Sequence, residues 1–256
     1  MTLYTIMKKR FVGIIALLIF YNSFAQKSES ELLKNHKFYF EKNIEMGKWS
    51  ATYYLLDGLV FIKENYCKNE LRSRTEFKYD RFRNVERKIV TYDINKRQIK
   101  DTFNLKLEYN GSLLVRKEFD FGMIENYSDF NELGKPKLIE RIEESDIKLW
   151  PYKTLISYDK NGNIMKSIEF SVNEGSTGKT SNEKAITYFK YDNWNNVVEI
   201  HRKYEPKQKF PIPITGGPLL YEYEYFRYKY NNNGLWTKKY KTVDGKEYLI
   251  AKRKYK

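Results

Sequence analysis

Cysteine and histidine are nearly absent from this chain. Cys67 is the single cysteine among 256 residues, and the two histidines are His36 and His201. One thiol excludes an intrachain disulfide framework and a cysteine-based zinc site. A catalytic triad needs a histidine between a nucleophile and an orienting group, and the sequence around neither histidine offers that setting. We therefore expect no metal, no cofactor and no histidine-based catalysis, and we expect Cys67 to pack as a small apolar side chain.

Long apolar runs are also scarce. Phe11–Phe20 is the one such run, and its ten residues are too few to span a bilayer comfortably. It follows the positive residues Lys8–Arg10 and precedes the small-residue pattern Ser23–Ala25. This order predicts a secretory signal peptide at residues 1–25. The protein is therefore predicted to be exported to the periplasm, the outer surface or the medium, with no integral membrane span in the mature chain.

Acidic residues are outnumbered by basic ones. The chain has 47 Lys and Arg against 33 Asp and Glu, which gives a formal net charge of +14. An exported basic protein is drawn to anionic surfaces, although residues spread along the chain, as here, are also typical of an ordinary solvated surface. The partners that this composition favours are an envelope polymer or another surface protein.

Proline is rare, and most of it falls in one place. Four of the six prolines lie in Glu205–Pro218, together with Gly216 and Gly217. Because proline cannot donate to a strand ladder, this segment is predicted to be a loop or an extended arm. Long loops in compact domains are often functional or disordered. We take Phe210 and Ile212 within it as candidate partner-binding residues, with a plain excursion of the chain as the alternative.

The rest of the chain divides into a short helical part and a long β part. In Ser28–Met46, apolar residues recur at steps of three and four, which predicts a helix within an N-terminal segment at residues 26–47. From residue 48 to 256, apolar and polar residues alternate between short turn signals, which predicts strands. Asp57-Gly58 and Asp244-Gly245 favour tight hairpins, since these residues tolerate positive φ angles.

One short motif recurs through the β part. Tyr158-Asp159 followed by Asn161-Gly162-Asn163-Ile164 is its clearest copy. Tyr79-Asp80 with Asn84-Val85 and Tyr191-Asp192 with Asn196-Val197 share the outline, and Tyr230-Asn231 with Gly234-Leu235 is a weaker copy. Repetition of this kind is the mark of a repeat architecture. Asp can accept hydrogen bonds from backbone N–H groups further on, and Asn or Gly can take the left-handed position, so the motif predicts turns.

The motif resembles the YD repeats of bacterial Rhs-type secreted proteins and of shorter exported proteins of Bacteroidota. The resemblance covers Glu76–Lys241 unevenly, and only the copy at Tyr158 matches the family pattern fully. It implies a β-sheet built from stacked hairpins in an exported protein. The chain is too short to enclose a toxin domain, so the toxin-delivery role of large family members is not implied. We predict an all-β fold, an elongated antiparallel meander of ten to fourteen strands with a short N-terminal helix.

An aromatic strand is the best candidate for a binding surface. In Leu220–Tyr230, aromatic residues alternate with charged ones, and the alternation changes phase in the middle. A β-bulge near Tyr225-Phe226 would keep all six rings on one face. Tyrosine rows can bind sugars or proteins, while cross-strand ring packing is the structural alternative. The candidate partner-binding rings are Tyr221, Tyr223, Tyr225, Phe226, Tyr228 and Tyr230.

The sequence favours a non-catalytic structural or interaction module of the cell envelope. Asn173–Thr180 nearly matches a phosphate-binding loop, but that motif works between a strand and a helix, and β signals flank it here, so no nucleotide is expected. The alternative function is a hydrolase that acts on an envelope polysaccharide or peptidoglycan through paired carboxylates such as Glu143-Glu144.

Overall fold

Sixteen antiparallel strands make up the fold. The structure, a computed structural model, describes residues 29–94, 97–143, 151–174, 180–214 and 217–256. Within this described part, no helix is both long and apolar enough to cross a membrane. The signal peptide predicted at residues 1–25 lies outside the described residues. The strands are β1 (Phe38–Asn43), β2 (Trp49–Leu56), β3 (Leu59–Cys67), β4 (Glu70–Tyr79), β5 (Val85–Ile94), β6 (Arg97–Asn110), β7 (Leu113–Phe119), β8 (Met123–Phe130), β9 (Pro136–Glu143), β10 (Lys153–Tyr158), β11 (Ile164–Glu174), β12 (Thr180–Tyr191), β13 (Val197–Glu205), β14 (Tyr223–Tyr230), β15 (Trp236–Val243) and β16 (Lys246–Tyr255).

The strand order is that of a closed barrel, which corrects the predicted open meander. Successive strands are neighbours, and β1 pairs antiparallel with both β2 and β16. An open meander would leave the first and last strands as free edges, which offer unpaired N–H and C=O groups to other chains. Pairing of β1 with β16 instead satisfies those groups within one molecule. The all-β class was predicted correctly, whereas the elongated arrangement and the strand number were wrong.

The predicted N-terminal helix is also wrong over most of its length. The helix covers residues 29–33, and Phe38–Asn43 form strand β1. Tyr39 is buried, stacks on Tyr53 with ring centroids 4.5 Å apart, and lies 5.7 Å from the ring of Tyr255. The residues of this stretch therefore pair with strands on both sides. This long-range pairing decides the structure, although the spacing of the apolar residues favours a helix.

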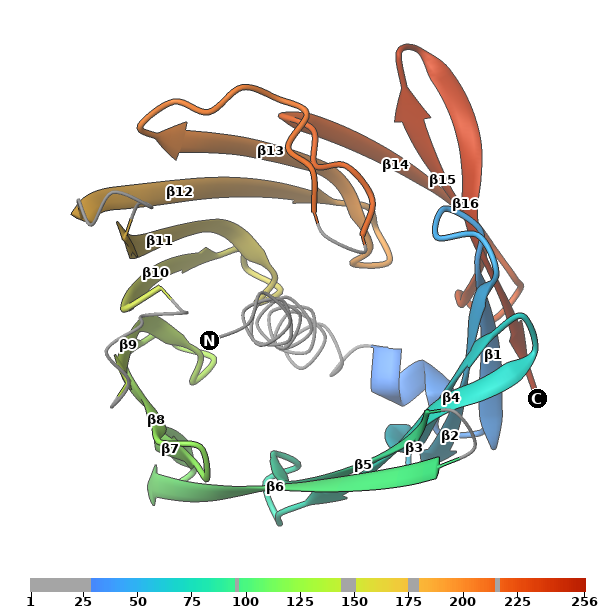
Figure 1. Cartoon of the computed structure of the whole chain (residues 1–256), viewed down its shortest axis with the longest axis horizontal. Coiled ribbons are helices and arrows are strands. Elements are labelled where there is room, and N and C mark those ends of the chain that lie inside the picture. Colours follow the sequence, from blue (N-terminus) through green and yellow to red (C-terminus); the bar gives the residue numbers. More distant parts are fainter. Residues whose placement is uncertain (1–28, 95–96, 144–150, 175–179, 215–216) are drawn as a thin grey trace. The chain divides into compact units, whose positions relative to one another are not determined.

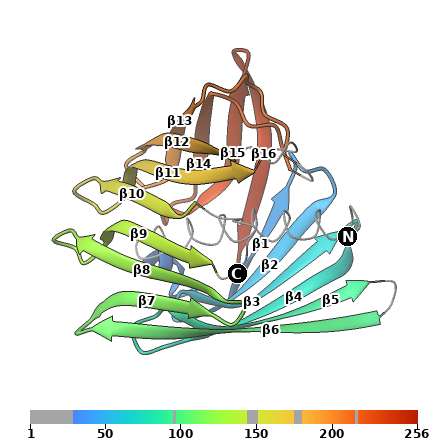
Figure 2. The same cartoon turned by 60° about the vertical axis from the view of Figure 1, so that its left-hand side comes forward.

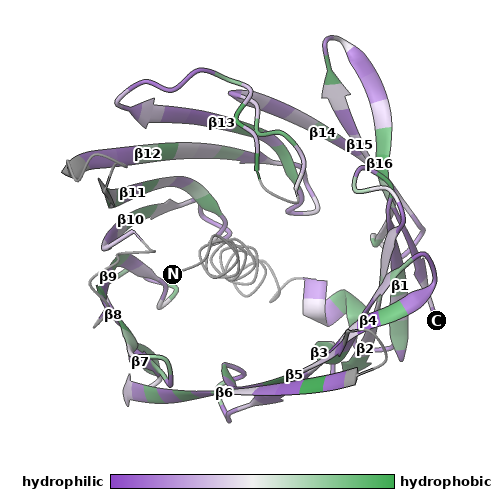
Figure 3. Ribbon diagram, viewed as in Figure 1, coloured by the Kyte–Doolittle hydropathy of each residue, from purple (hydrophilic) through white to green (hydrophobic). Residues whose placement is uncertain are grey.

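The chain forms two compact units. Unit 1 includes Leu107–Tyr223, and unit 2 includes Gln26–Lys106 and Glu224–Lys256. Within unit 1, β7 to β13 follow one another side by side along a curved sheet (Figures 1 and 2). Within unit 2, β1 lies between β16 and β2, so that residues from the two ends of the chain share one sheet. Figure 3 shows hydrophilic and hydrophobic residues interleaved along the strands.

Each Tyr-Asp motif forms a tight turn between strands, as predicted. In the clearest copy, the Asp159 carboxylate accepts hydrogen bonds from the N–H groups of Asn161 (2.9 Å) and Asn163 (2.8 Å). Gly162 follows with φ at 78°. The same pattern of two bonds and a positive φ three residues on recurs in the turns that begin at Asp80, Asp192 and Asn231. Every copy of the motif therefore forms a turn through the same side-chain hydrogen bonds.

A fifth turn of this kind was missed in the sequence. The Asn131 side chain accepts hydrogen bonds from the N–H groups of Leu133 (3.0 Å) and Lys135 (2.9 Å), and Gly134 has φ at 70°. Phe130 stands where the motif has tyrosine, and Pro136 where it has an apolar residue. The spacing from Asn131 to Gly134 equals that from Asp159 to Gly162, and this was the signal that could have identified the turn.

Tyrosine hydroxyls tie these turns to the neighbouring strand. Tyr158 donates to the carbonyl of Pro136 (2.8 Å), and Tyr191 donates to the carbonyl of Ile164 (2.8 Å). In unit 2, Tyr79 and Tyr255 make the same kind of bond to the carbonyls of Val60 and Trp236, each at 2.7 Å. Since Pro136 and Ile164 each follow an earlier turn, the hydroxyl bonds join successive turns along one edge of the sheet.

The apolar cores lie close to these turns. In unit 1, Tyr127, Ile139, Ile156 and Ile164 form a buried cluster, against which Leu114, Phe130, Tyr158 and Phe189 pack. In unit 2, the corresponding buried cluster consists of Leu33, Tyr39, Leu55, Val60 and Leu235. Both cores are small for their units, so the backbone ladder and the turn bonds carry a large part of the stability.

Removing one tyrosine hydroxyl tests the role of these bonds. We expect Tyr158→Phe to lower the free energy of unfolding by about 1–2 kcal/mol, because the buried carbonyl of Pro136 then loses its donor. Tyr152→Phe is the matched control, since Tyr152 is 44% exposed and should change stability little. Urea unfolding followed by circular dichroism measures both variants, and equal effects would contradict this role.

Candidate functional site

The aromatic strand does not present six rings on one face. Alternate residues of β14 face opposite ways, so that Tyr223 and Tyr225 are exposed while Phe226 and Tyr228 are partly buried. The register shift lies between Lys229 and Tyr230, and the predicted bulge at Tyr225-Phe226 is therefore wrong. The physical reason is that each of the four Tyr-Asp motifs found in the sequence brings a register shift at its own tyrosine.

Three of the predicted rings pack inside unit 2. Tyr228 lies 6.2 Å from the ring of Tyr230 and packs edge-on against Trp236 at 5.8 Å. The Lys239 ammonium lies 4.2 Å from the centre of the Phe226 ring. Burial lowers the pKa of Lys239. These rings hold the sheet together, as in the structural alternative considered for them.

Tyr225 is exposed and belongs to unit 2, whereas the remaining predicted residues lie in unit 1, within or just after the Pro-rich segment. Tyr223 stacks on His201 at 4.1 Å, and His201 in turn stacks on Tyr188 at 5.6 Å. Phe210 packs against Tyr204 at 5.7 Å. Ile212 pairs with Leu220 in an isolated bridge, and the Tyr221 carbonyl accepts a bond from the Arg202 guanidinium at 3.0 Å. The Pro-rich segment is an ordered loop over residues 206–214, and partner binding there stays a prediction.

A buried charged cluster lies on one face of the unit 1 sheet. Glu125 has 0% exposure, accepts a hydrogen bond from the Tyr127 hydroxyl and pairs with the Arg141 guanidinium at 2.7 Å. Arg141 also donates to the Thr154 hydroxyl at 2.9 Å. Glu169 lies beside Thr154 in the register of β10 and β11; burial raises the pKa of its carboxyl, and Arg141 opposes that rise.

This cluster is the arrangement closest to the paired carboxylates of the hydrolase alternative. A glycosidase needs two carboxyl groups that both reach the substrate. Glu125 has no exposed surface, and its two carboxylate oxygens accept hydrogen bonds from Tyr127 and Arg141, so it cannot contact a ligand. The pair named from the sequence is divided: Glu143 ends β9, and Glu144 lies outside the described residues.

A second charged cluster stabilises unit 2. The Arg253 guanidinium pairs with Glu41 at 2.7 Å and with Glu29, and it lies 3.9 Å from the centre of the Trp236 ring. Burial opposes its charge, but these carboxylates hold the pKa of Arg253 well above its usual range. Buried charges of this kind need partners for stability, and the cluster is therefore structural.

A polar cleft of about 660 Å³ lies at the turn edge of unit 1. Its walls come from two neighbouring Tyr-Asp turns and from β11 and β12, the two strands between those turns. We call it the turn cleft, and it is lined by Asp159, Lys160, Asn161, Met165, Phe189, Lys190, Tyr191, Asp192, Asn193 and Asn195. A hydrogen bond of 2.9 Å from the Asn163 amide to the Asn195 side chain fixes the two turns beside each other.

Apolar side chains stand exposed on the turns of this edge. Trp194 is 49% exposed, Met165 is 45% exposed and Leu133 is 55% exposed. Trp194 and Leu133 occupy the same position of their turns, two residues after Asp192 and Asn131. A Cβ on Gly162 would lie 3.0 Å from the Leu133 side chain, so adjacent turns are in close contact. Sequence analysis missed this site because it treated the motif as a turn only and not as a surface.

The described residues contain no group of three or more His, Cys, Asp or Glu placed to hold a metal ion. The phosphate-loop-like segment is flanked by strand on both sides, with Asn173 in β11 and Thr180 in β12. This is the β setting that argued against a nucleotide site, although residues 175–179 lie outside the described part. Cys67 is a free, partly buried thiol in β3.

Comparison with known proteins gives little to build on. No family model and no curated protein matches the sequence. Among solved structures, the chain is similar to a porin-like protein from Bacteroides uniformis, with 12% identity, a TM-score of 0.31, and coverage of 86% of this chain and 98% of that one. At this TM-score a shared function does not follow, and membership of the YD-repeat family stays a prediction.

The pH dependence of stability tests the burial of Glu169. Burial raises the pKa of the Glu169 carboxyl in the folded state. The free energy of unfolding therefore falls as the pH rises from the unfolded pKa of about 4.3 through the folded pKa, because the charged form is disfavoured in the folded protein. We expect Glu169→Gln to raise the free energy of unfolding at pH 7 and to leave it nearly unchanged at pH 3.5. Glu140→Gln, at an exposed position of β9, is the control. Destabilisation by Glu169→Gln at pH 7 would show instead that its charge stabilises Arg141.

Proposed function

We propose that this chain is an exported, non-catalytic protein of the cell envelope that binds a glycan in the turn cleft of unit 1. The observation that carries the proposal is the exposed side chain of Trp194, which lies in the turn between Asn193 and Asn195, two residues that line a polar cleft of about 660 Å³. An exposed tryptophan offers a large apolar face, and sugars combine such faces with hydroxyl groups that need polar partners.

The chemistry of the cleft suits hydroxyl groups better than an apolar ligand. The carboxylates of Asp159 and Asp192 accept hydrogen bonds from backbone N–H groups of their own turns. These bonds fix the shape of the cleft wall. Asn161 and Asn193 lie at the turns themselves and line the cleft. Amide groups both donate and accept hydrogen bonds, which matches the hydroxyl pattern of a sugar. Lys160 adds a further donor.

The exposed face of β12 and β13 supports a surface that meets water. Lys184 pairs with Glu205 at 3.1 Å, and Lys190 pairs with Glu199 at 2.9 Å. These two pairs lie near the two ends of the β12–β13 ladder.

The buried carboxylates support the non-catalytic part of the proposal. Glu125 and Arg141 satisfy each other inside the sheet and are closed to a ligand. The Tyr223 ring of unit 1 is exposed as well, and the partner binding predicted for it from the sequence stays a prediction. The turn cleft is the primary site of the proposal.

Truncation of the exposed indole tests the proposal. We expect Trp194→Ala to weaken binding of neutral pentasaccharides (cellopentaose, chitopentaose and xylopentaose) at least tenfold for whichever of them binds, a loss of about 1.4 kcal/mol. Titration calorimetry measures the affinity. Trp49→Ala is the control, because Trp49 is 39% exposed in unit 2. Equal binding by wild type and Trp194→Ala, or no binding of the three sugars by wild type, would contradict the proposal.

A further inference from the structure

Four lysines form a straight row across four neighbouring strands of unit 2. Lys42 on β1 is the register partner of Lys252 on β16, and Lys252 is the partner of Lys238 on β15. Lys238 in turn pairs with Lys229 on β14. Because register partners point to the same face of a sheet, all four ammonium groups lie on one side. We call these four residues the lysine row.

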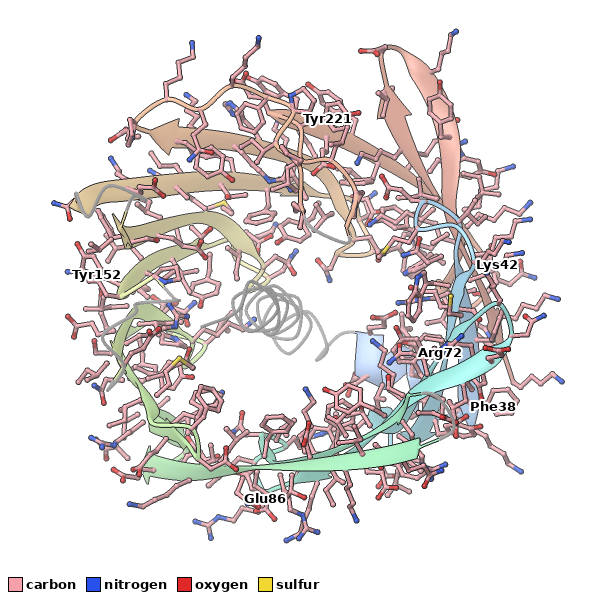
Figure 4. The ribbon with its side chains drawn as sticks, in the orientation of Figure 1. Phe38, Lys42, Arg72, Glu86, Tyr152 and Tyr221 are labelled. Atoms are coloured by element: carbon pink, nitrogen blue, oxygen red, sulfur yellow. The ribbon has the colours of Figure 1, made fainter. Side chains whose placement is uncertain are left out.

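The row extends over several strand widths. Neighbouring strands lie about 4.8 Å apart, so the four positions span roughly 14 Å. Lys42, Lys229 and Lys252 are exposed and Lys238 is half-buried. No ion pair of 4.0 Å or less to a described residue is recorded for any of the four. Figure 4 shows Lys42 together with Phe38 on β1, projecting from the same face of the strand.

Like charges directly opposite each other destabilise a sheet. Some lysines elsewhere on this protein are matched by acids, as in Lys190 with Glu199. Glu247, near Lys229, is held by Arg227 in a double hydrogen bond of 2.6 Å and 2.6 Å. Lys229 also acts electrostatically on Glu247, whereas Lys238 and Lys252 each have a lysine as register partner on both neighbouring strands.

Aromatic rings border the row on both sides. Phe40 is the register partner of Lys254, one step along β1 and β16 from the Lys42–Lys252 pair. On the other side, the Tyr240 ring lies 4.3 Å from the Arg227 guanidinium. A row of positive charge between apolar rings suits a linear anion whose backbone also offers a flat face.

We propose that the lysine row is a docking surface for an acidic polysaccharide, with one carboxylate-bearing chain lying across β14, β15, β16 and β1. The row is linear, which matches a polymer better than a single small anion. Its flanking rings match sugar faces, and its charge is opposite to that of uronate groups. This surface consists of residues other than those of the turn cleft, and the inference does not rest on glycan binding there.

The test compares three variants in binding to polygalacturonate. We expect Lys42→Gln/Lys238→Gln/Lys252→Gln to weaken binding at least tenfold in 50 mM NaCl, and to reduce the steepness with which affinity falls between 50 and 300 mM NaCl. The control Lys100→Gln/Lys207→Gln/Lys209→Gln removes the same charge from exposed positions outside the row and should keep most of the affinity. Microscale thermophoresis gives the affinities.

Further measurements separate charge from folding and from other partners. The charge-preserving variant Lys42→Arg/Lys238→Arg/Lys252→Arg should bind like wild type, and the glutamine variant should unfold at the same or a higher temperature, since repulsion is removed. Equal losses in the glutamine variant and its control would overturn the proposal, because diffuse charge would then explain binding. Tighter binding of single-stranded DNA or phosphatidylglycerol vesicles than of polygalacturonate would overturn the choice of partner. The Trp194→Ala variant should bind polygalacturonate like wild type, so failure of this proposal is distinct from failure of the turn cleft.

Discussion

The side-chain oxygen at the second position of the Tyr-Asp motif is the constraint on which the rest of the structure depends. By accepting two backbone N–H groups, Asp159 closes a turn within five residues and forces the positive φ of Gly162. The register shift at the preceding tyrosine then directs that ring into the core, where its hydroxyl binds the neighbouring strand. The turn, the register shift and the tyrosine that packs into the core therefore occur together in each copy of the motif. Repetition of the motif builds the sheet.

The distribution of charge follows from the small size of the cores. Apolar residues gather near the turns, and beyond them the buried faces carry charged groups such as Glu125 and Arg253. These groups are stable there because each is matched by a partner, and a matched buried ion pair has little capacity left for catalysis. The surfaces proposed here to bind ligands lie instead at the turn edge and on the exposed faces, at Trp194 and Lys42.

The binding surfaces could be predicted from the sequence only in part. The aromatic content of β14 was visible, but which rings would be exposed depended on a bulge whose position is set by the Tyr230 turn. The turn cleft requires that residues near Asp159 and Asp192 lie side by side, which no local pattern states. The lysine row is still less visible, because Lys42 and Lys252 are brought together only by pairing of the first strand with the last.

The sequence by itself determined the turns, the hairpins and the all-β class, since each depends on contacts within a few residues. Asp57-Gly58 and the Asn231 turn needed no partner to be recognised. Only the tertiary structure decided that Phe38–Asn43 is a strand and that the sheet closes on itself. That choice rests on hydrogen bonds and ring contacts between residues about two hundred positions apart, such as Tyr39 and Tyr255. The local sequence carries no information about such pairs. The pairing of β1 with β16 outweighs the local preference of Phe38–Asn43 for a helix.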